Sequence, residues 1–206
     1  MPIHVRLNIS QTKKTEANSE SYVDLDSHAD TCVLGNNSLL IETPYPERHA
    51  IVSFADPSLG TVNKPILSGA FKYTSPADGT SYILVVHQAI HIDTMNHSLL
   101  CPMQLRANDV ILDECPKSMT ETPTKETHSL LLKTEDNNTL RIPLMLRGVT
   151  STFPITKPTL HDFDILPIIE LTSHDLEWDP QSRDFAEAEA QFLDTFGNFK
   201  PPGDKY

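Results

Sequence analysis

Every second residue is apolar from Ile3 to Ile9, and a period of two predicts a half-buried β-strand. The polar stretch over residues 11–19 predicts a loop, and residues 21–25 predict the returning strand of a hairpin. That second strand ends at Asp26. The pattern therefore delivers an acidic side chain where a strand enters a loop.

The middle of the chain predicts further strands separated by turns. Residues 75–80 contain Pro-Ala-Asp-Gly, which predicts a turn between two strand-like segments. Residues 82–86 are continuously apolar and predict a central strand. The elements predicted in this region are strands over 51–55, 70–74, 81–90 and 110–112 and a short helix over 103–107.

The last third of the chain is richer in proline. Two strands are predicted over residues 129–133 and 139–146, and an extended segment over 152–158. Residues 159–180 are acidic and interrupted by prolines, and they predict a linker.

A single long helix is predicted over residues 180–196. Asp179 is its expected N-cap, Pro180 occupies its first position, and Gly197 follows its end. Helical spacing places four apolar residues on one face, and this face is expected to pack on the β core. The four residues are Phe185, Ala188, Phe192 and Phe196.

Composition narrows the class of protein. The chain has 206 residues, of which 38% are hydrophobic, enough for one domain of ordinary size with an appendage. Its net charge of −12 supplies no basic patch, so no direct binding of nucleic acid is expected. Three cysteines and no apolar leader predict a reducing, intracellular setting. No run approaches the roughly 18 apolar residues that span a membrane.

Residues 23–35 read Val-Asp-Leu-Asp-Ser-His-Ala-Asp-Thr-Cys-Val-Leu-Gly. An Asp followed by a hydroxyl residue at a strand-to-loop junction is the local arrangement of an aspartic protease, which needs a carboxylate at the floor of a cleft. Residues 25–34 resemble the active-site segment of retropepsins, most closely the protease region of copia-type retrotransposon polyproteins. Residues 88–105 resemble the second copia signature, an apolar strand followed by Asn-Leu-Leu-Ser and a short helix ending in Gln-Leu.

The resemblance covers residues 1–116 and implies an all-β, retropepsin-like acid-protease barrel. Residues 117–158 would be a β extension, and residues 159–206 an acidic, proline-rich linker with one amphipathic helix and a tail. A flap that closes over substrate is expected within residues 52–69. The residues to which the resemblance gives a role are Asp26 as the catalytic acid, Ser27, His28, Ala29, Asp30 and Thr31 in the active-site loop, Asp56, Pro57, Ser58, Leu59 and Gly60 at the flap tip, and Leu99 and Leu100 as apolar support.

Peptide hydrolysis by this class needs two carboxylates that share one proton, and the sequence holds one matching Asp. The other Asp-Thr-x-Gly, residues 194–197, is predicted as the end of a helix with Gly197 as its cap. Asp26 is therefore expected to meet its own copy across a two-fold axis in a homodimer.

Two neighbours of Asp26 have expected roles of their own. Ser27 would brace the loop by a hydrogen bond across the two-fold axis. Asp30 would hold the substrate backbone or pair with Arg6 or Arg106; alternatively, it is a turn residue that bonds its own backbone.

His28 stands where the family has glycine, and three outcomes are open. The ring could point outward, stand beside the aspartates as a third titrating group, or block the cleft. The backbone N–H that glycine offers to the catalytic carboxylate is retained by histidine, which adds a Cβ and a ring.

Asp26, His28, Asp30 and Cys32 alternate along the chain, and their side chains are of types that can bind a metal ion. The chain has no Cys-x-x-Cys and no close His/Cys pair with zinc-finger spacing. His87 and His91 would lie about 13 Å apart in a strand. No metal ligand and no cofactor is predicted.

The sequence thus predicts an aspartic endopeptidase that cuts a retrotransposon polyprotein as a homodimer, inside the cell, in the cytoplasm or in virus-like particles. Its partners would be its own copy and a polypeptide substrate, with no nucleic acid and no membrane. The alternatives are a catalytically silent protease-fold module that serves structure or dimerisation and, third, a metal-binding module.

Overall fold

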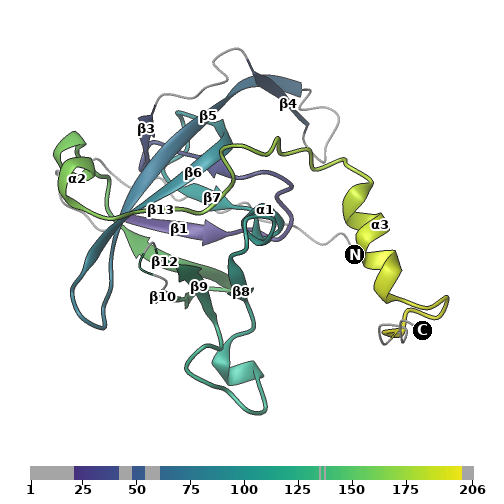
Figure 1. The fold of residues 1–206 in the computed structure, drawn as a ribbon. Coiled ribbons are helices and arrows are strands. Elements are labelled where there is room, and N and C mark those ends of the chain that lie inside the picture. Colours follow the sequence, from purple (N-terminus) through teal and green to yellow (C-terminus); the bar gives the residue numbers. More distant parts are fainter. Residues whose placement is uncertain (1–20, 42–47, 54–60, 135, 137, 201–206) are drawn as a thin grey trace, which may run out of the picture.

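The computed structural model describes residues 21–41, 48–53, 61–134, 136 and 138–200. The strand predicted over residues 3–9 and the flap tip predicted at Asp56, Pro57, Ser58, Leu59 and Gly60 lie outside the described residues. The described part is mostly β structure, in agreement with the predicted all-β class (Figure 1). Its strands are β1 Ser21–Leu25, β2 Val33–Leu34, β3 Leu39–Ile41, β4 His49–Ser53, β5 Thr61–Thr74, β6 Ser81–His91, β7 Ser98–Leu100, β8 Ile111–Asp113, β9 Ser129–Lys133, β10 Thr139–Pro143, β11 Met145–Arg147, β12 Thr150–Ile155 and β13 Ile168–Glu170; its helices are α1 Pro102–Arg106, η2 Lys117–Met119 (3-10), α2 Leu160–Ile165 and α3 Asp184–Phe192.

Strand β6 lies inside the large sheet, as its apolar run predicts. Eight of its eleven residues are buried, because β5 covers one edge while β13 and then β2 cover the other. The β5–β6 hairpin closes through the predicted turn, where Gly79 adopts a φ of +76°. That left-handed conformation favours glycine.

Strand β1 is also an interior strand. It pairs with β12 in antiparallel fashion and with β7 in parallel fashion. Val23 and Leu25 point into the core and are buried, while the alternate residues Tyr22 and Asp24 are half-buried. Two covered edges fix the position at which β1 ends, and Asp26 follows at once.

The large sheet curls but does not close into a barrel within the described residues. Its strand order runs from β11 to β3, with β4 and β13 attached to β5 and β6. A single bridge between Lys72 and Thr156 joins β5 to the residue that follows β12, through two hydrogen bonds of 2.8 and 2.9 Å. The coarse prediction of an all-β fold holds, and the expected closed barrel is not formed there.

A second sheet of order β10-β9-β8 shares the core of the first. Leu130 and Ile142 from this sheet belong to the same buried cluster as Val23 and Phe153 of the large sheet. Residue 116 is the end of the predicted protease segment, yet strands on its two sides pair directly. β8 pairs with β9, and β1 pairs with β12.

The linker predicted over residues 159–180 is wrong, because the segment is ordered by specific contacts. Thr159 and Asp162 form a capping box that starts α2, and Asp162 also accepts a hydrogen bond of 2.6 Å from Lys72 Nζ in β5. After α2, β13 pairs in parallel with β6. Local acidity and proline content do not reveal the open edge of β6, which this strand covers.

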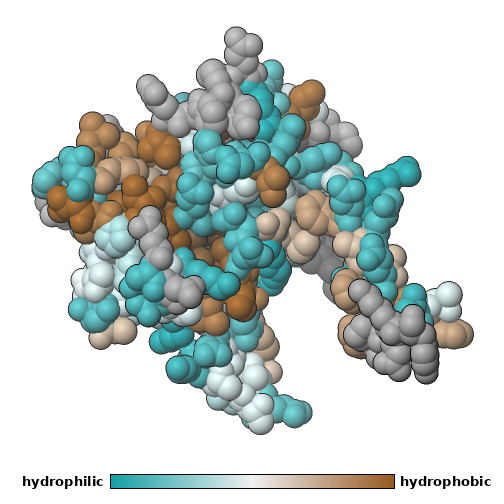
Figure 2. All heavy atoms as spheres, viewed as in Figure 1, coloured by the Kyte–Doolittle hydropathy of each residue, from teal (hydrophilic) through white to brown (hydrophobic). Residues whose placement is uncertain are grey.

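The long helix predicted over residues 180–196 is shorter. Its predicted packing on the core is limited to Phe185, whose ring lies 5.5 Å from that of Trp178 beside the core. Asp179 bonds the N–H of Gln181 at 2.9 Å and forms a turn, so helix α3 begins only at Asp184. Such local side-chain bonds compete with helix formation. No residue of α3 is buried, and Phe192 is 53% exposed. The helix stands clear of the sheets in the view of Figures 1 and 2.

The second Asp-Thr-x-Gly also differs from its prediction. It forms a turn beyond α3, in which Asp194 accepts hydrogen bonds of 2.8 Å from the N–H groups of Phe196 and Asn198. Gly197 has a φ of +79° in this turn. Asp194 therefore stabilises a turn and does not follow a buried strand as Asp26 does.

Candidate functional site

Asp26 sits at the tip of β1 and is held by its own loop. Its N–H donates to the carbonyl of Leu100 at 3.0 Å, and its carbonyl accepts from the N–H of Ala29 at 3.2 Å. The N–H of His28 donates to Oδ1 of Asp26 at 2.9 Å. The backbone is thus fixed on both sides of a half-buried carboxylate that already receives one hydrogen bond.

The predicted apolar support lies beside this loop. Strand β7 runs parallel to β1, so Leu99 is paired with Asp24 and Leu100 with Leu25. Leu100 is fully buried, while Leu99 lines the groove that contains Asp26. One of the two leucines anchors the floor and the other forms part of the surface.

The second arm of the loop, Asp30 to Cys32, is held by α1. The N–H of Cys32 donates to Oε1 of Gln104 at 2.8 Å, and Nε2 of Gln104 donates to the carbonyl of Gln88 at 3.2 Å. The N–H of Cys101 donates to the sulfur of Cys32 at 3.2 Å. Burial raises the pKa of the Cys32 thiol, which keeps it neutral. Sequence reasoning placed Gln104 in the family signature but gave it no role.

Trp178 is the contact that sequence reasoning missed. Its indole N–H donates to the carbonyl of Asp30 at 3.0 Å and lies 3.3 Å from Oγ1 of Thr31. It is the only tryptophan in the chain, which is the one signal that could have drawn attention to it. The residue lies in the stretch that was predicted as a linker.

A groove of about 620 Å³ opens over Asp26. Three carboxylates line it, from Asp24, Asp26 and Glu114, and His28 lines it as well. The remaining lining is largely apolar and includes side chains with high exposure, such as Val149 at 98% and Met119 at 75%. This groove is therefore a concave surface lined by both carboxylates and apolar side chains.

Asp24 has the most perturbed electrostatics at this groove. Burial raises the pKa of its carboxyl group, the neighbouring Asp26 raises it further, and His97 and Arg147 lower it. Nε2 of His97 lies 3.7 Å from Oδ2 of Asp24. The net effect is a carboxyl group that retains its proton to a higher pH than an exposed aspartate.

The other predicted loop residues lie around Asp26 with different exposure. Ser27, His28 and Asp30 are exposed, Ala29 is half-buried and Thr31 is buried. Arg106, which was expected to pair with Asp30, instead bonds Glu114 and the carbonyl of Leu112. The alternative partner, Arg6, lies outside the described residues.

Within the described ranges, no three His, Cys, Asp or Glu side chains gather closely enough to hold a metal ion. The metal-binding hypothesis therefore receives no support from this part of the chain. The described residues also contain no helix that is long and apolar enough to cross a membrane.

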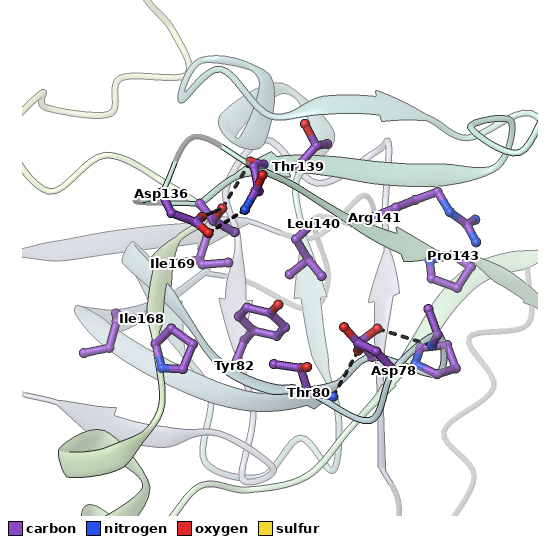
Figure 3. Close-up of a pocket in the computed structure, with 16 residues that line it drawn as sticks. Asp78, Thr80, Tyr82, Asp136, Thr139, Leu140, Arg141, Pro143, Ile168 and Ile169 are labelled. Carbon is purple, nitrogen blue, oxygen red and sulfur yellow. Dashed lines mark hydrogen bonds between the residues drawn. The ribbon is translucent and has the colours of Figure 1, made fainter.

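A second pocket, of about 480 Å³, lies between the β5–β6 turn and the β9–β10 turn (Figure 3). Its carboxylates serve the turns themselves, since Asp78 accepts from the N–H of Thr80 and Asp136 from the side chain of Asn138. Arg141 donates to the carbonyl of Lys125 at 3.0 Å. None of the predicted site residues lines this pocket, so the candidate site remains the Asp26 groove.

Comparison with known proteins does not relate this site to a known family. The chain matches no protein-family model and has no significant match among curated proteins or solved structures.

Proposed function

We propose that this chain is an aspartic endopeptidase whose active site forms between two copies, each of which contributes Asp26. The observation that carries the proposal is the Asp26 carboxylate itself. It follows a buried strand, lies at a groove and accepts a hydrogen bond from the N–H of His28. In an aspartic protease, the loop must hold such a carboxylate by backbone bonds so that it can act on water.

The reaction would use two Asp26 carboxyl groups that share one proton. The ionised one takes a proton from the attacking water, and the protonated one donates to the carbonyl oxygen of the scissile bond. Two carboxylates a few ångströms apart do not readily ionise together, which keeps that shared proton in place. Because each chain has one such loop, the site requires a two-fold axis.

The substrate would be an extended polypeptide. The groove combines apolar lining from Leu99 and Leu146 with the reactive carboxylate, which suits a peptide that presents apolar side chains beside the scissile bond. The assignment to a retrotransposon polyprotein rests on the resemblance of residues 25–34 and 88–105 to copia-type proteases.

A second candidate is a silent protease-fold module that only dimerises. The observations that favour it are the exposed His28 at the place of a glycine and the exposed apolar side chains of Met119 and Val149 beside the groove. Apolar surface next to a rim of polar residues suits contact with a partner.

The deciding experiment is a cleavage assay at acidic pH with a peptide library, with and without pepstatin. Asp26→Asn should abolish cleavage, because the amide can neither accept nor donate the shared proton in the same way. Asp194→Asn is the matched control, since Asp194 begins the other Asp-Thr-x-Gly and serves a turn. Cleavage by Asp26→Asn would contradict the proposal, and a dimer without cleavage would favour the silent module.

A further inference from the structure

We infer that residues 168–178 form a strap that holds the active-site loop in place, with Trp178 as its positioning residue. The inference extends the proposed function, because it assigns to a distant segment the placement of the loop that bears Asp26. Sequence reasoning had assigned this segment to a linker, outside the protease segment.

The strap begins as a strand of the large sheet. β13 pairs with β6 from Ile168 to Glu170, and the ladder continues with the N–H of Leu171, which donates to the carbonyl of Val85 at 2.8 Å. At Thr172, the side-chain hydroxyl group takes the place of the backbone in bonding β6. That hydroxyl accepts from the N–H of His87 at 2.7 Å and donates to its carbonyl at 2.8 Å.

A bulge in β6 turns a side chain toward the strap. The register of the β5–β6 pair shifts at Ser68, opposite His87 and Gln88, and Gln88 has a φ of +53°. Bulges commonly re-aim a side chain next to a functional site. Here the bulge lies between the strap and the helix α1 that carries Gln104.

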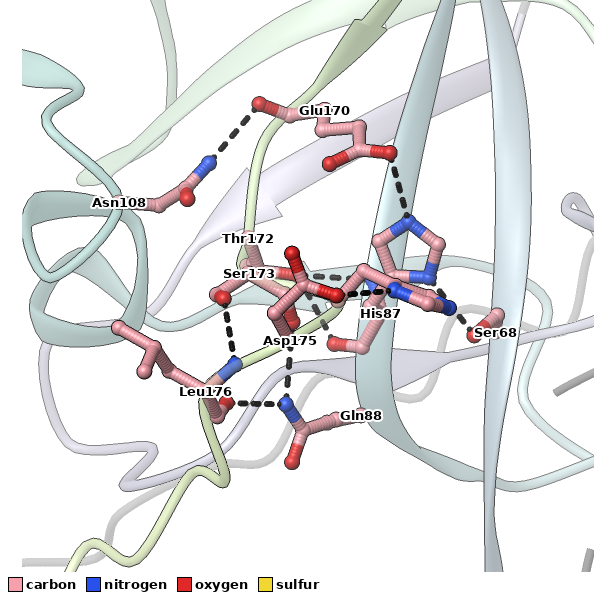
Figure 4. A network of polar contacts seen from close by, with 10 residues as sticks. Ser68, His87, Gln88, Asn108, Glu170, Thr172, Ser173, Asp175 and Leu176 are labelled. Carbon is pink, nitrogen blue, oxygen red and sulfur yellow. Dashed lines mark hydrogen bonds and ion pairs between the residues drawn. The ribbon is translucent and has the colours of Figure 1, made fainter. Parts of the chain in front are cut away.

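Gln88 bonds the strap at three points. Its Nε2 donates to the carbonyls of Ser173 and Leu176 at 3.0 and 2.6 Å, and its Oε1 accepts from the N–H of Trp178 at 2.9 Å. Figure 4 shows Gln88 directed at the strap beside His87 and Thr172. One buried side chain thus fixes the path of the strap up to Trp178.

Trp178 completes the connection to the loop. Its indole N–H donates to the carbonyl of Asp30, and its ring lies 5.5 Å from the ring of Phe185. Two residues after Asp30, the N–H of Cys32 donates to the side chain of Gln104, which holds the loop from α1. Gln88 contacts both supports, because its carbonyl accepts from Gln104 while its side chain holds the strap.

The consequence is a mechanical link between β6 and Asp26. The loop runs from Asp26 to Cys32, and both of its arms are anchored, the first by Leu100 and the second by Gln104 and Trp178. Reactive groups must be held to well within an ångström for full activity. Loss of the indole bond should loosen the second arm and reduce turnover more than substrate binding.

The test begins with the wild-type chain labelled with ¹⁵N at its single tryptophan. The one indole N–H should be slow to exchange with solvent if it bonds Asp30. Trp178→Phe then keeps an aromatic ring for Phe185 but removes the N–H. We expect roughly fivefold faster amide exchange at Cys32, on the scale of one neutral hydrogen bond, and a lower kcat with little change in KM.

Phe185→Leu is the matched control, because it disturbs the ring contact and leaves the indole N–H in place. It should leave both the Cys32 amide and kcat close to wild type. An indole N–H that exchanges freely, or a Trp178→Phe chain with unchanged exchange at Cys32, would overturn the inference. If the wild type cleaves no peptide, the proposed function fails, and the exchange measurements still decide whether the strap holds the loop.

Discussion

The backbone N–H of His28 lies 2.9 Å from Oδ1 of Asp26 and donates a hydrogen bond to it. The residue that departs most from the retropepsin pattern therefore keeps the one backbone contact that a glycine would supply at this place. The side chain of His28 is exposed at the groove wall. What histidine adds to the site is an imidazole ring, and its effect can be measured.

His28→Gln should change the shape of the pH–rate profile. The substitution keeps the Cβ and the N–H but replaces the imidazole, a common acid–base group, with an uncharged amide. His28→Gly should change the profile in the same way, with an added loss of stability because glycine loosens the unfolded chain. His161→Gln is the control, since His161 is exposed on α2. A profile identical to wild type at equal activity would remove His28 from the mechanism.

Activity should require pairing of two intact chains. When an equal amount of Asp26→Asn chain is added to the wild type and the two exchange freely, about half of the wild-type chains should be drawn into mixed pairs. Cleavage should then fall to about half. Sedimentation would report the dimer in parallel. Undiminished cleavage after complete exchange, or an active monomer, would argue for a site within one chain.

Asp24→Asn should stabilise the protein at pH 7 relative to the wild type. The pKa of Asp24 is raised by burial, so the folded state binds more protons than the unfolded state. The stability that Asp24 contributes is full below its pKa in the unfolded chain and is lost as pH rises through its pKa in the folded chain. Melting temperatures of wild type and variant should therefore diverge as pH rises above the ordinary value of 3.8. Asp164→Asn, at an exposed position, should give no such divergence.

His87 should make the protein less stable as pH falls below its ordinary 6.5. Burial lowers the pKa of the imidazole, the ring of His174 at 5.1 Å lowers it further, and Glu170 and Asp175 oppose this. The stability is present above the unfolded pKa and is lost as pH falls through the folded one. His87→Gln should flatten the pH dependence of unfolding as pH falls below 6.5. An equal slope in both proteins would contradict this reading.

Asp162→Asn should destabilise the chain at neutral pH and lose this effect in acid. The hydrogen bond from Lys72 is the largest cause that lowers the pKa of Asp162 to about 2, and the bonds from Thr159 lower it further. Its contribution is full above the ordinary value of 3.8 and is lost as pH falls toward 2. An asparagine can still accept from the Thr159 N–H, so the cost should come from the lost ion pair with Lys72, about 1 kcal/mol, measurable by urea unfolding. Asp164→Asn on the same helix is the matched control.

Local patterns in the sequence were enough to predict several parts of this protein. The apolar run over residues 82–86 predicted an interior strand, and the Pro-Ala-Asp-Gly stretch predicted the turn of the β5–β6 hairpin. The strand predicted over residues 21–25 is present and ends directly before Asp26. These features depend on near neighbours, whose spacing directly sets the periodicity and the turn.

The tertiary structure decided the rest. Residues 168–170 became a strand because β6, more than 80 residues earlier, had an edge to cover. Trp178 reached Asp30 across 148 residues because the side chain of Gln88 holds the backbone of Trp178 beside the loop. Helix α3 stayed largely exposed although its sequence is amphipathic, because among its apolar side chains Phe185 meets the Trp178 ring while Phe192 stays 53% exposed. Pairing between distant segments depends on which edges and donors the folded chain leaves open, and no short window of sequence contains that information.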